Sequence, residues 1–162
     1  MQKIFAVVMI GTAVALAACG KKDEQKTVYS DGTNTVTQTG SGDHMTITGS
    51  NGEKVEFGSG ASAKMPSYLS LYPGAKITSS FTGQGKDGGG GVVTFHAGAA
   101  PAQIIAFYKQ KAAAAGMSEA MNMETGGTTM FAANNDKAKT SLSVTATKAA
   151  DGADAQVTWS TK

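Results

Sequence analysis

PAQIIAFYKQKAAAAG, residues 101–116, is the stretch of sequence that decides the fold. Proline suits the first turn of a helix, where its missing N–H is not needed, and Gly116 suits the position just after a helix end. Apolar side chains fall along one side of this stretch: Ile104, Ile105, Phe107, Tyr108, Ala112 and Ala115. The sequence therefore predicts one amphipathic helix that buries this side.

Alternating apolar runs lie on both sides of the predicted helix. Residues 76–82 and 92–97 predict a hairpin, and we expect the glycine-rich residues 83–91 between them to form a flexible loop. Four more strands are predicted after the helix, over residues 117–124, 128–133, 140–147 and 155–161, with residues 151–154 in the last turn. This order of strand, strand, helix and strand meander predicts an α+β fold, an antiparallel sheet with one helix packed on it.

A shorter β-rich segment precedes this domain. Residues 35–37, 45–48 and 54–57 are alternating, β-branched runs at nearly regular spacing, and Asn51-Gly52 is a strong hairpin signal. Apolar side chains are few here, so the segment needs a surface to pack on, or else it is partly mobile. We predict a short β-meander or repeat segment over residues 27–60 and an α+β domain over residues 61–162.

The composition argues against several functions. The chain has 14 basic residues, all lysine, and 12 acidic residues, and this near balance gives no electrostatic reason to expect a nucleic-acid partner. A single Cys allows neither an intrachain disulfide nor a thiolate zinc cluster. No Gly-x-Ser-x-Gly or Ser-x-x-Lys motif is present, and Glu53 and Glu56 would point to opposite faces of a strand. We predict neither an enzyme nor a cofactor.

The first twenty residues have the pattern of a secretory signal peptide. Lys3 precedes an apolar run over residues 4–16 that is too short to cross a membrane, and polar residues begin at Lys21. Leu16-Ala17-Ala18-Cys19 at its end resembles the lipobox of bacterial lipoproteins. The resemblance implies recognition of Leu16, Ala17 and Ala18 by the signal peptidase, cleavage before Cys19, and a lipid anchor on Cys19.

The residue after Cys19 bears on the membrane to which the protein would be anchored. Asp at this position tends to retain Gram-negative lipoproteins in the inner membrane, whereas this chain has Gly20. The resemblance thus implies the periplasmic face of the outer membrane, with the inner membrane as an alternative. Ordinary cleavage after Ala17 would instead release a soluble periplasmic protein with an unpaired Cys. We predict a signal peptide over residues 1–18 and a lipidated Cys with its tether over residues 19–26.

The body of the chain offers only weak candidates for chemistry. Met117, Met121 and Met123 share strand parity, and Met130 lies on the next run. Of these, Met121 and Met123 are the candidates for binding Cu(I), although methionine more often fills gaps in a core. His44 and His96 fit surface positions, and the glycine-rich stretch lacks the context of a phosphate loop. Asp31-Gly32-Thr33-Asn34 and residues 151–154 fit turns better than Ca²⁺ sites.

Residues 65–162 resemble small proteobacterial lipoproteins in the order of Tyr72-Pro73-Gly74-Ala75, hairpin, helix and strands. That resemblance implies no activity. We therefore predict a non-enzymatic envelope interaction or structural protein that meets an envelope protein or cell-wall partner, with a contact surface around Tyr68, Leu71 and Tyr72. The alternative is a periplasmic carrier of a small ligand or Cu(I).

Overall fold

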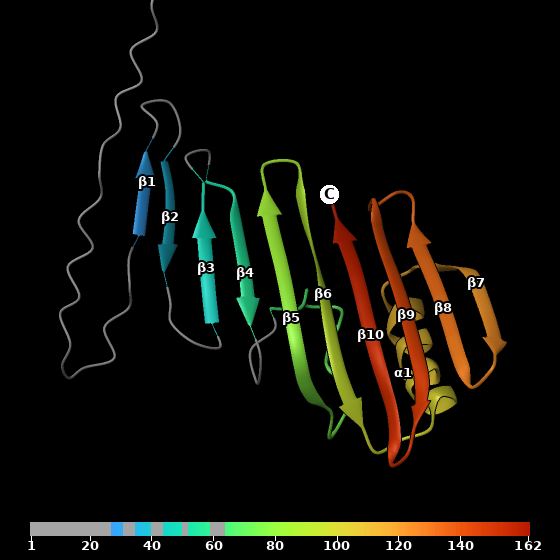
Figure 1. Ribbon diagram of the computed structural model, residues 1–162. Helices are drawn as coiled ribbons and strands as arrows, with labels where there is room; N and C mark the ends of the chain where they lie inside the picture. Colours follow the sequence, from blue (N-terminus) through green and yellow to red (C-terminus); the bar gives the residue numbers. More distant parts are fainter. Residues whose placement is uncertain (1–26, 31–34, 40–43, 50–51, 59–63) are drawn as a thin grey trace, which may run out of the picture.

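The structure, a computed structural model, describes residues 27–30, 35–39, 44–49, 52–58 and 64–162. Within these residues ten strands form one antiparallel sheet, in the order β1-β2-β3-β4-β5-β6-β10-β9-β8-β7, and one helix packs on it (Figure 1). No helix in this part of the chain is long and apolar enough to cross a membrane. The predicted signal peptide, Cys19 and its tether lie outside the described residues.

The elements follow the predicted order. Before the helix lie β1 (Thr27–Ser30), β2 (Thr35–Thr39), β3 (His44–Thr48), β4 (Lys54–Gly58), β5 (Lys76–Gly85) and β6 (Gly88–Ala97). The helix α1 (Pro101–Ala114) is followed by β7 (Ser118–Thr125), β8 (Thr128–Asn135), β9 (Thr140–Ala149) and β10 (Gly152–Thr161). The prediction of an antiparallel sheet with one helix packed on it is confirmed.

The ends of α1 follow local chemistry. Pro101 is in the first turn, and the Gln103 side-chain oxygen accepts a hydrogen bond of 3.0 Å from the Ala100 N–H. At the other end Gly116 takes a φ of 68°, and the Met117 N–H reaches back to the Ala112 carbonyl at 2.9 Å. A left-handed residue after a helix suits glycine, because it has no Cβ to clash.

The core lies between α1 and strands β6, β10, β9 and β8, in the half of the sheet that ends at β7. Ile104, Ile105, Tyr108 and Ala112 are the buried side of the helix. They form one cluster with buried strand residues that include Val93, Phe95, Phe131, Leu142, Val144 and Val157. The short alanine side chain at the C-terminal end of α1 lets the helix backbone lie close to the sheet.

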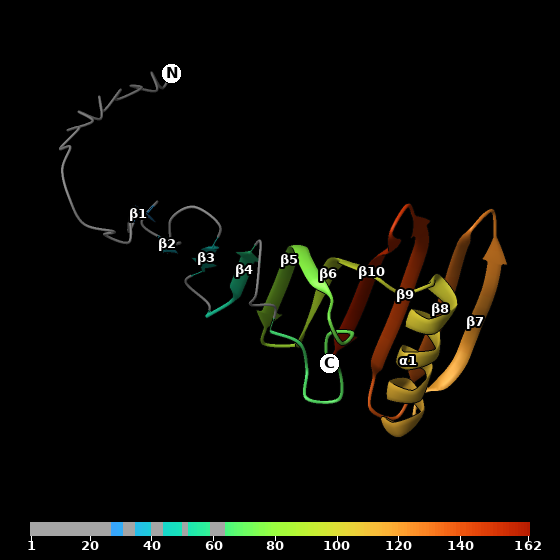
Figure 2. The ribbon, with the colours of Figure 1, turned by 90° about the horizontal axis from the view of Figure 1, so that it is seen from below.

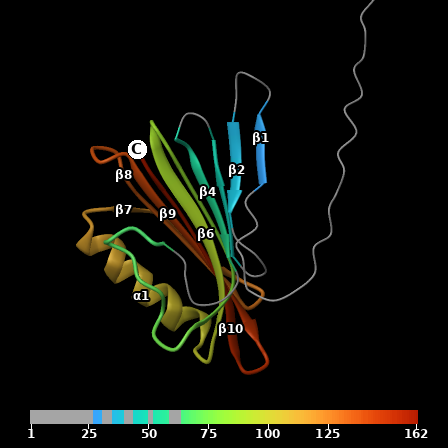
Figure 3. The same ribbon diagram turned by 90° about the vertical axis from the view of Figure 1, so that its left-hand side faces the viewer.

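A connecting segment covers the same face beside the helix. Residues 64–75, here called the strap, run along the face of the sheet on which α1 packs (Figures 2 and 3). Leu69 is buried, and the Tyr72 and Phe107 rings meet edge to face at 5.3 Å. Tyr68, Leu71 and Tyr72, where a contact surface was predicted, are only partly exposed, because their side chains pack against the core.

The glycine-rich stretch is not a flexible loop. The β5–β6 hairpin turns at Lys86 and Asp87, and residues 88–91 lie inside β6, where they pair with β5 and with β10. The expected turn at residues 151–154 is also shorter, because β10 already begins at Gly152. Both predictions gave glycine its usual place in turns, whereas here it serves close strand packing.

The strands predicted before the domain are present as β2, β3 and β4. Consecutive strands pair from β1 to β4, and β4 pairs with β5, so this segment continues the sheet of the domain. Of the predicted hairpin dipeptide, Asn51 lies outside the described residues, and Gly52 has the positive φ of 79° that suits a turn.

Candidate functional site

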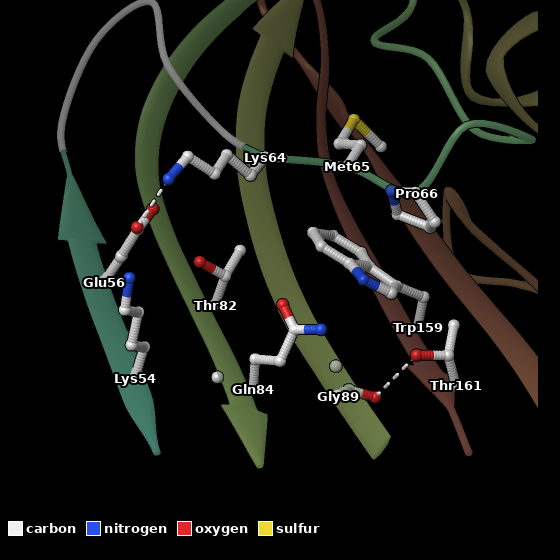
Figure 4. Close-up of a pocket in the computed structure, with 12 residues that line it drawn as sticks. Lys54, Glu56, Lys64, Met65, Pro66, Thr82, Gln84, Gly89, Trp159 and Thr161 are labelled. Atoms are coloured by element: carbon white, nitrogen blue, oxygen red, sulfur yellow. Dashed lines mark hydrogen bonds and ion pairs between the residues drawn. The ribbon is translucent and has the colours of Figure 1, made fainter. Parts of the chain in front are cut away.

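A cleft of about 370 Å³ opens between the strap and the sheet, beyond the reach of α1. The helix packs on β7 to β10, so it leaves the helix-side face of β4 and β5 uncovered. Figure 4 shows side chains from β4, β5, β6, β10 and the start of the strap around this cleft. Its lining consists of Lys54, Glu56, Lys64, Met65, Pro66, Thr82, Gly83, Gln84, Gly89, Gly90, Trp159 and Thr161.

Strand register places the polar side chains of the cleft in one layer. Glu56 lies opposite Thr82, and Lys54 lies opposite Gln84. Residues directly opposite in an antiparallel pair share a face of the sheet, so these four side chains point the same way. Thr161 at the end of β10 adds a hydroxyl that donates to the Gly89 carbonyl at 3.3 Å. The floor of the cleft therefore offers hydroxyl, amide and charged groups together.

Trp159 forms the apolar wall where the cleft meets the core. Its side chain is buried, and Met65 and Pro66 of the strap line the cleft beside it (Figure 4). The ring lies over Gly91, since a Cβ on that glycine would come within 2.4 Å of the indole Cζ2 atom. Glycine in β6 is thus what makes room for the indole.

The cleft has one positive charge in excess. The Lys64 Nζ and Glu56 Oε1 atoms form an ion pair at 2.6 Å, and Lys64 is mostly exposed, so the pair adds little stability. Among the described residues no carboxylate lies within ion-pair distance of the Lys54 ammonium. An anionic group that entered the cleft would therefore meet an uncompensated lysine.

The sequence of the α+β domain is similar to a known protein family. Residues 77–161, more than half of the chain, match the START domain-like family. The chain belongs to the START domain-like family. Its matched region includes β5, β6, α1 and β7 to β10 almost entirely, and with them Thr82, Gln84 and Trp159 of the cleft. No curated protein matches the chain, and no solved structure does.

The methionine candidates of this START domain-like chain lie far from the cleft strands. Met121 and Met123 are on β7, which forms one edge of the sheet, and point away from α1 with 39% and 46% of their surface exposed. Met117 instead belongs to the core. The expected parity of Met117 with the other two fails, because the strand begins at Ser118 and has a bulge between Glu119 and Met121.

The two histidines of the START domain-like chain lie on strands. His96 is near the end of β6, as predicted, and its Nδ1 and Nε2 atoms lie 2.9 Å from Asp154 Oδ1 and 3.3 Å from Asp151 Oδ1. The carboxylates use opposite edges of the imidazole ring, so the three groups do not converge on one point, and no metal-binding group of His, Cys, Asp and Glu occurs in the described residues. His44 is the first residue of β3.

The remaining predicted site residues have no place in this description. Cys19, Leu16, Ala17 and Ala18 lie outside the described residues, as does the turn at residues 31–34. The cleft itself was missed from the sequence. One signal for it was present, since the single tryptophan follows a strand pattern and a run of four glycines offers a place for an aromatic ring to lie.

Proposed function

We propose that this protein is a membrane-anchored periplasmic lipoprotein that binds a small anionic amphiphile in the cleft, and that it is not an enzyme. The observation that supports the ligand is the cleft's division into an apolar wall at Trp159, Met65 and Pro66 and a polar floor with the uncompensated Lys54. Membership of the START domain-like family favours binding over catalysis, because such domains generally bind.

The chemistry of the ligand follows from the apolar wall and the polar floor of the cleft. An apolar group would lie against the edge of Trp159 that lines the cleft, and a carboxylate, sulfonate or phosphate would approach Lys54. Thr82 and Gln84 between them could hydrogen-bond to polar atoms of the same molecule. The volume lies within the range of roughly 300–1,000 Å³ that is usual for small-molecule pockets.

The cleft has a built-in reporter, because Trp159 is the only tryptophan of the chain. Titration with 1-anilinonaphthalene-8-sulfonate, an anionic amphiphile, should quench or shift the Trp159 emission with saturation at one dye per chain. Lys54→Gln should weaken the dye by about threefold to tenfold, which corresponds to roughly 1 kcal/mol. Lys76→Gln removes the same charge from the far end of β5 and should leave the affinity unchanged.

Two results would contradict this site. Equal weakening by Lys54→Gln and Lys76→Gln would mean that the dye responds only to net charge. Dye binding without any change in Trp159 emission would place the bound dye elsewhere on the molecule.

The anchor is proposed from the lipobox resemblance alone. Acyl chains on Cys19 would hold the chain at the membrane, since one chain binds only marginally and a second makes anchoring stable. Cys19→Ser should move the protein from the membrane fraction to the soluble fraction, or leave an uncleaved precursor of higher mass. Mature-sized Cys19→Ser protein that remains in membranes would contradict lipid anchoring. We propose the periplasmic face of the outer membrane, and Gly20→Asp should then shift the protein to the inner-membrane fraction.

A second function, contact with an envelope protein or cell-wall partner, is favoured by an exposed aromatic pair. Phe57 and Phe81 are 37% and 41% exposed on the face of the sheet away from α1, with ring centroids 5.2 Å apart. Phe57 comes from residues 27–60, which we propose to be a short β-repeat segment distinct from the domain over residues 61–162. A photo-crosslinking residue at position 81 in intact envelopes should capture a protein partner that the same residue at Thr158, on the same face, does not.

A further inference from the structure

Three methionines gather on one face of the β7–β8 hairpin. Met123 lies directly opposite Met130, and Met121 precedes Met123 by two residues on the same strand. This alternation puts all three side chains on one face of the sheet. Phe131 and Ala133 of β8, which have the other parity, belong to the core under α1, so the methionines face away from the helix.

Core packing does not account for these positions. Met121 and Met123 are 39% and 46% exposed, and Met130 is half-buried between neighbouring strands. Met117, by contrast, is buried in the core and does fill it. A methionine whose thioether meets solvent buries less apolar surface than one in the core, so the three outer methionines stabilise the fold less than Met117 does.

The spacing brings the three thioethers within reach of one small ion. Side chains directly opposite in an antiparallel pair have Cβ atoms about 4.5–5.5 Å apart, and diagonal neighbours are about 7–8 Å apart. Methionine has three rotatable bonds beyond Cα and a sulfur near its end, so such side chains can turn their sulfurs toward a common point. The bulge between Glu119 and Met121 further bends this edge strand.

The chemistry of this face selects a soft ion. Glu119 and Glu124 of the same strand lie on the other face of the sheet, since Glu119 is opposite Ala133 before the bulge and Glu124 is opposite Thr129. Glu119 also forms an ion pair with Lys109 of α1 at 3.2 Å. On the outer face the neighbours of Met130 and Ala132 across the pair with β9 are Thr145 and Ser143, which are uncharged. Thioethers without carboxylates favour Cu(I) over the hard ions Mg²⁺ and Ca²⁺.

We propose that Met121, Met123 and Met130 bind one Cu(I) ion on the outer face of the β7–β8 hairpin. The site is distinct from the cleft, which lies on the other face of the sheet over the central strands β4, β5, β6 and β10. The proposal therefore does not depend on the ligand proposed for the cleft. The ion is bound as Cu(I) and leaves as Cu(I), so no electron is transferred.

The test is an anaerobic Cu(I) titration of the full chain in competition with bicinchoninate, a chromophoric Cu(I) chelator. All proteins have Cys19→Ser, because an unmodified thiol would itself bind Cu(I). One Cu(I) per chain should bind, with a dissociation constant below about 1 μM. Met121→Leu, Met123→Leu and Met130→Leu should each weaken it by about tenfold or more, and the triple variant should abolish it.

The controls separate binding from folding. Leucine keeps the size and apolar character of methionine at exposed positions, so unfolding temperatures should stay the same in all variants. Met65→Leu, a methionine at the cleft, should bind Cu(I) as well as the parent protein does. Undiminished Cu(I) binding by the triple variant would overturn the proposal, and so would a parent protein that binds Zn²⁺ as tightly as Cu(I) or binds Cu(I) only in the millimolar range.

Discussion

At the scale of single residues, Tyr108 is the most unusual member of the core. Its side chain is fully buried against Phe95 and Phe107, and its hydroxyl has no hydrogen-bond partner among the described residues. Burial raises the pKa of the Tyr108 hydroxyl well above the ordinary value of a tyrosine. The Tyr72 backbone lowers this pKa by less than burial raises it, and it does not form a hydrogen bond with the hydroxyl. The ring thus stabilises the core, whereas the hydroxyl costs free energy.

Removal of this hydroxyl should not destabilise the protein. We expect Tyr108→Phe to leave the free energy of unfolding unchanged or to raise it by about 1 kcal/mol, because a buried polar group without a partner is lost and the ring is kept. Urea denaturation measures the difference. Tyr108→Ala should instead lower it by about 3–5 kcal/mol, as expected for a large core cavity. A loss above about 1 kcal/mol in Tyr108→Phe would show that the hydroxyl has a stabilising partner.

The same residue predicts how stability depends on alkaline pH. The pKa values of Tyr68 and Tyr108 are raised by burial, so the folded protein holds these protons more tightly than the unfolded chain does. The contribution of these two hydroxyls to the free energy of unfolding is fully present below about pH 10, the pKa of a tyrosine in the unfolded chain, and it is lost as the pH rises above that value. The free energy of unfolding should fall above pH 10, and it should fall less steeply in Tyr108→Phe, because lysine titration is common to both proteins. Equal slopes would contradict the assignment.

At the scale of elements, the sequence predicted those helices and strands whose own apolar periodicity indicates the side that is buried. The helix at Pro101–Ala114 and the strands after it could be predicted, because their apolar periodicity records which side is buried. Residues 88–91 could not be placed in β6 from local sequence, because the need for glycine there comes from the close approach of the neighbouring strands and, at Gly91, from the Trp159 ring. The partial burial of Tyr72 likewise could not be predicted, because it comes from contact with Phe107, which is on the helix.

Gly91 tests this explanation of the glycine run. Gly91→Ala places a Cβ against the Trp159 ring, so we expect a loss of about 1–3 kcal/mol in the free energy of unfolding, together with a changed Trp159 emission. Gly83→Ala is the matched control. It lies on the neighbouring β5, where a Cβ would meet only the Lys54 carbonyl at 4.0 Å. An equal loss in both variants would show that glycine serves the strand backbone rather than the indole.

At the scale of the whole molecule, the core and the cleft are formed by residues from different parts of the chain. Every member of the core cluster, and every side chain packed against it, lies between Met65 and Trp159. The cleft, in contrast, needs Lys54 and Glu56 from β4 as well as Trp159 from β10. Sequence alone could not predict that site, because its parts are about a hundred residues apart and meet only through the strand order and the position of the strap.

This division predicts that residues 64–162 fold without the strands before them. The truncated chain keeps all core residues and loses only β1 to β4, which pair at one edge of the sheet. We expect its unfolding temperature to lie within about 3 °C of the full chain, because little buried apolar surface is removed. Calorimetry would measure the transition, and hydrogen exchange in the full chain should be faster in β3 and β4 than in β6 and β9. A truncated chain that unfolds more than about 10 °C lower, or without a cooperative transition, would mean that β1 to β4 belong to the same folding unit as the core.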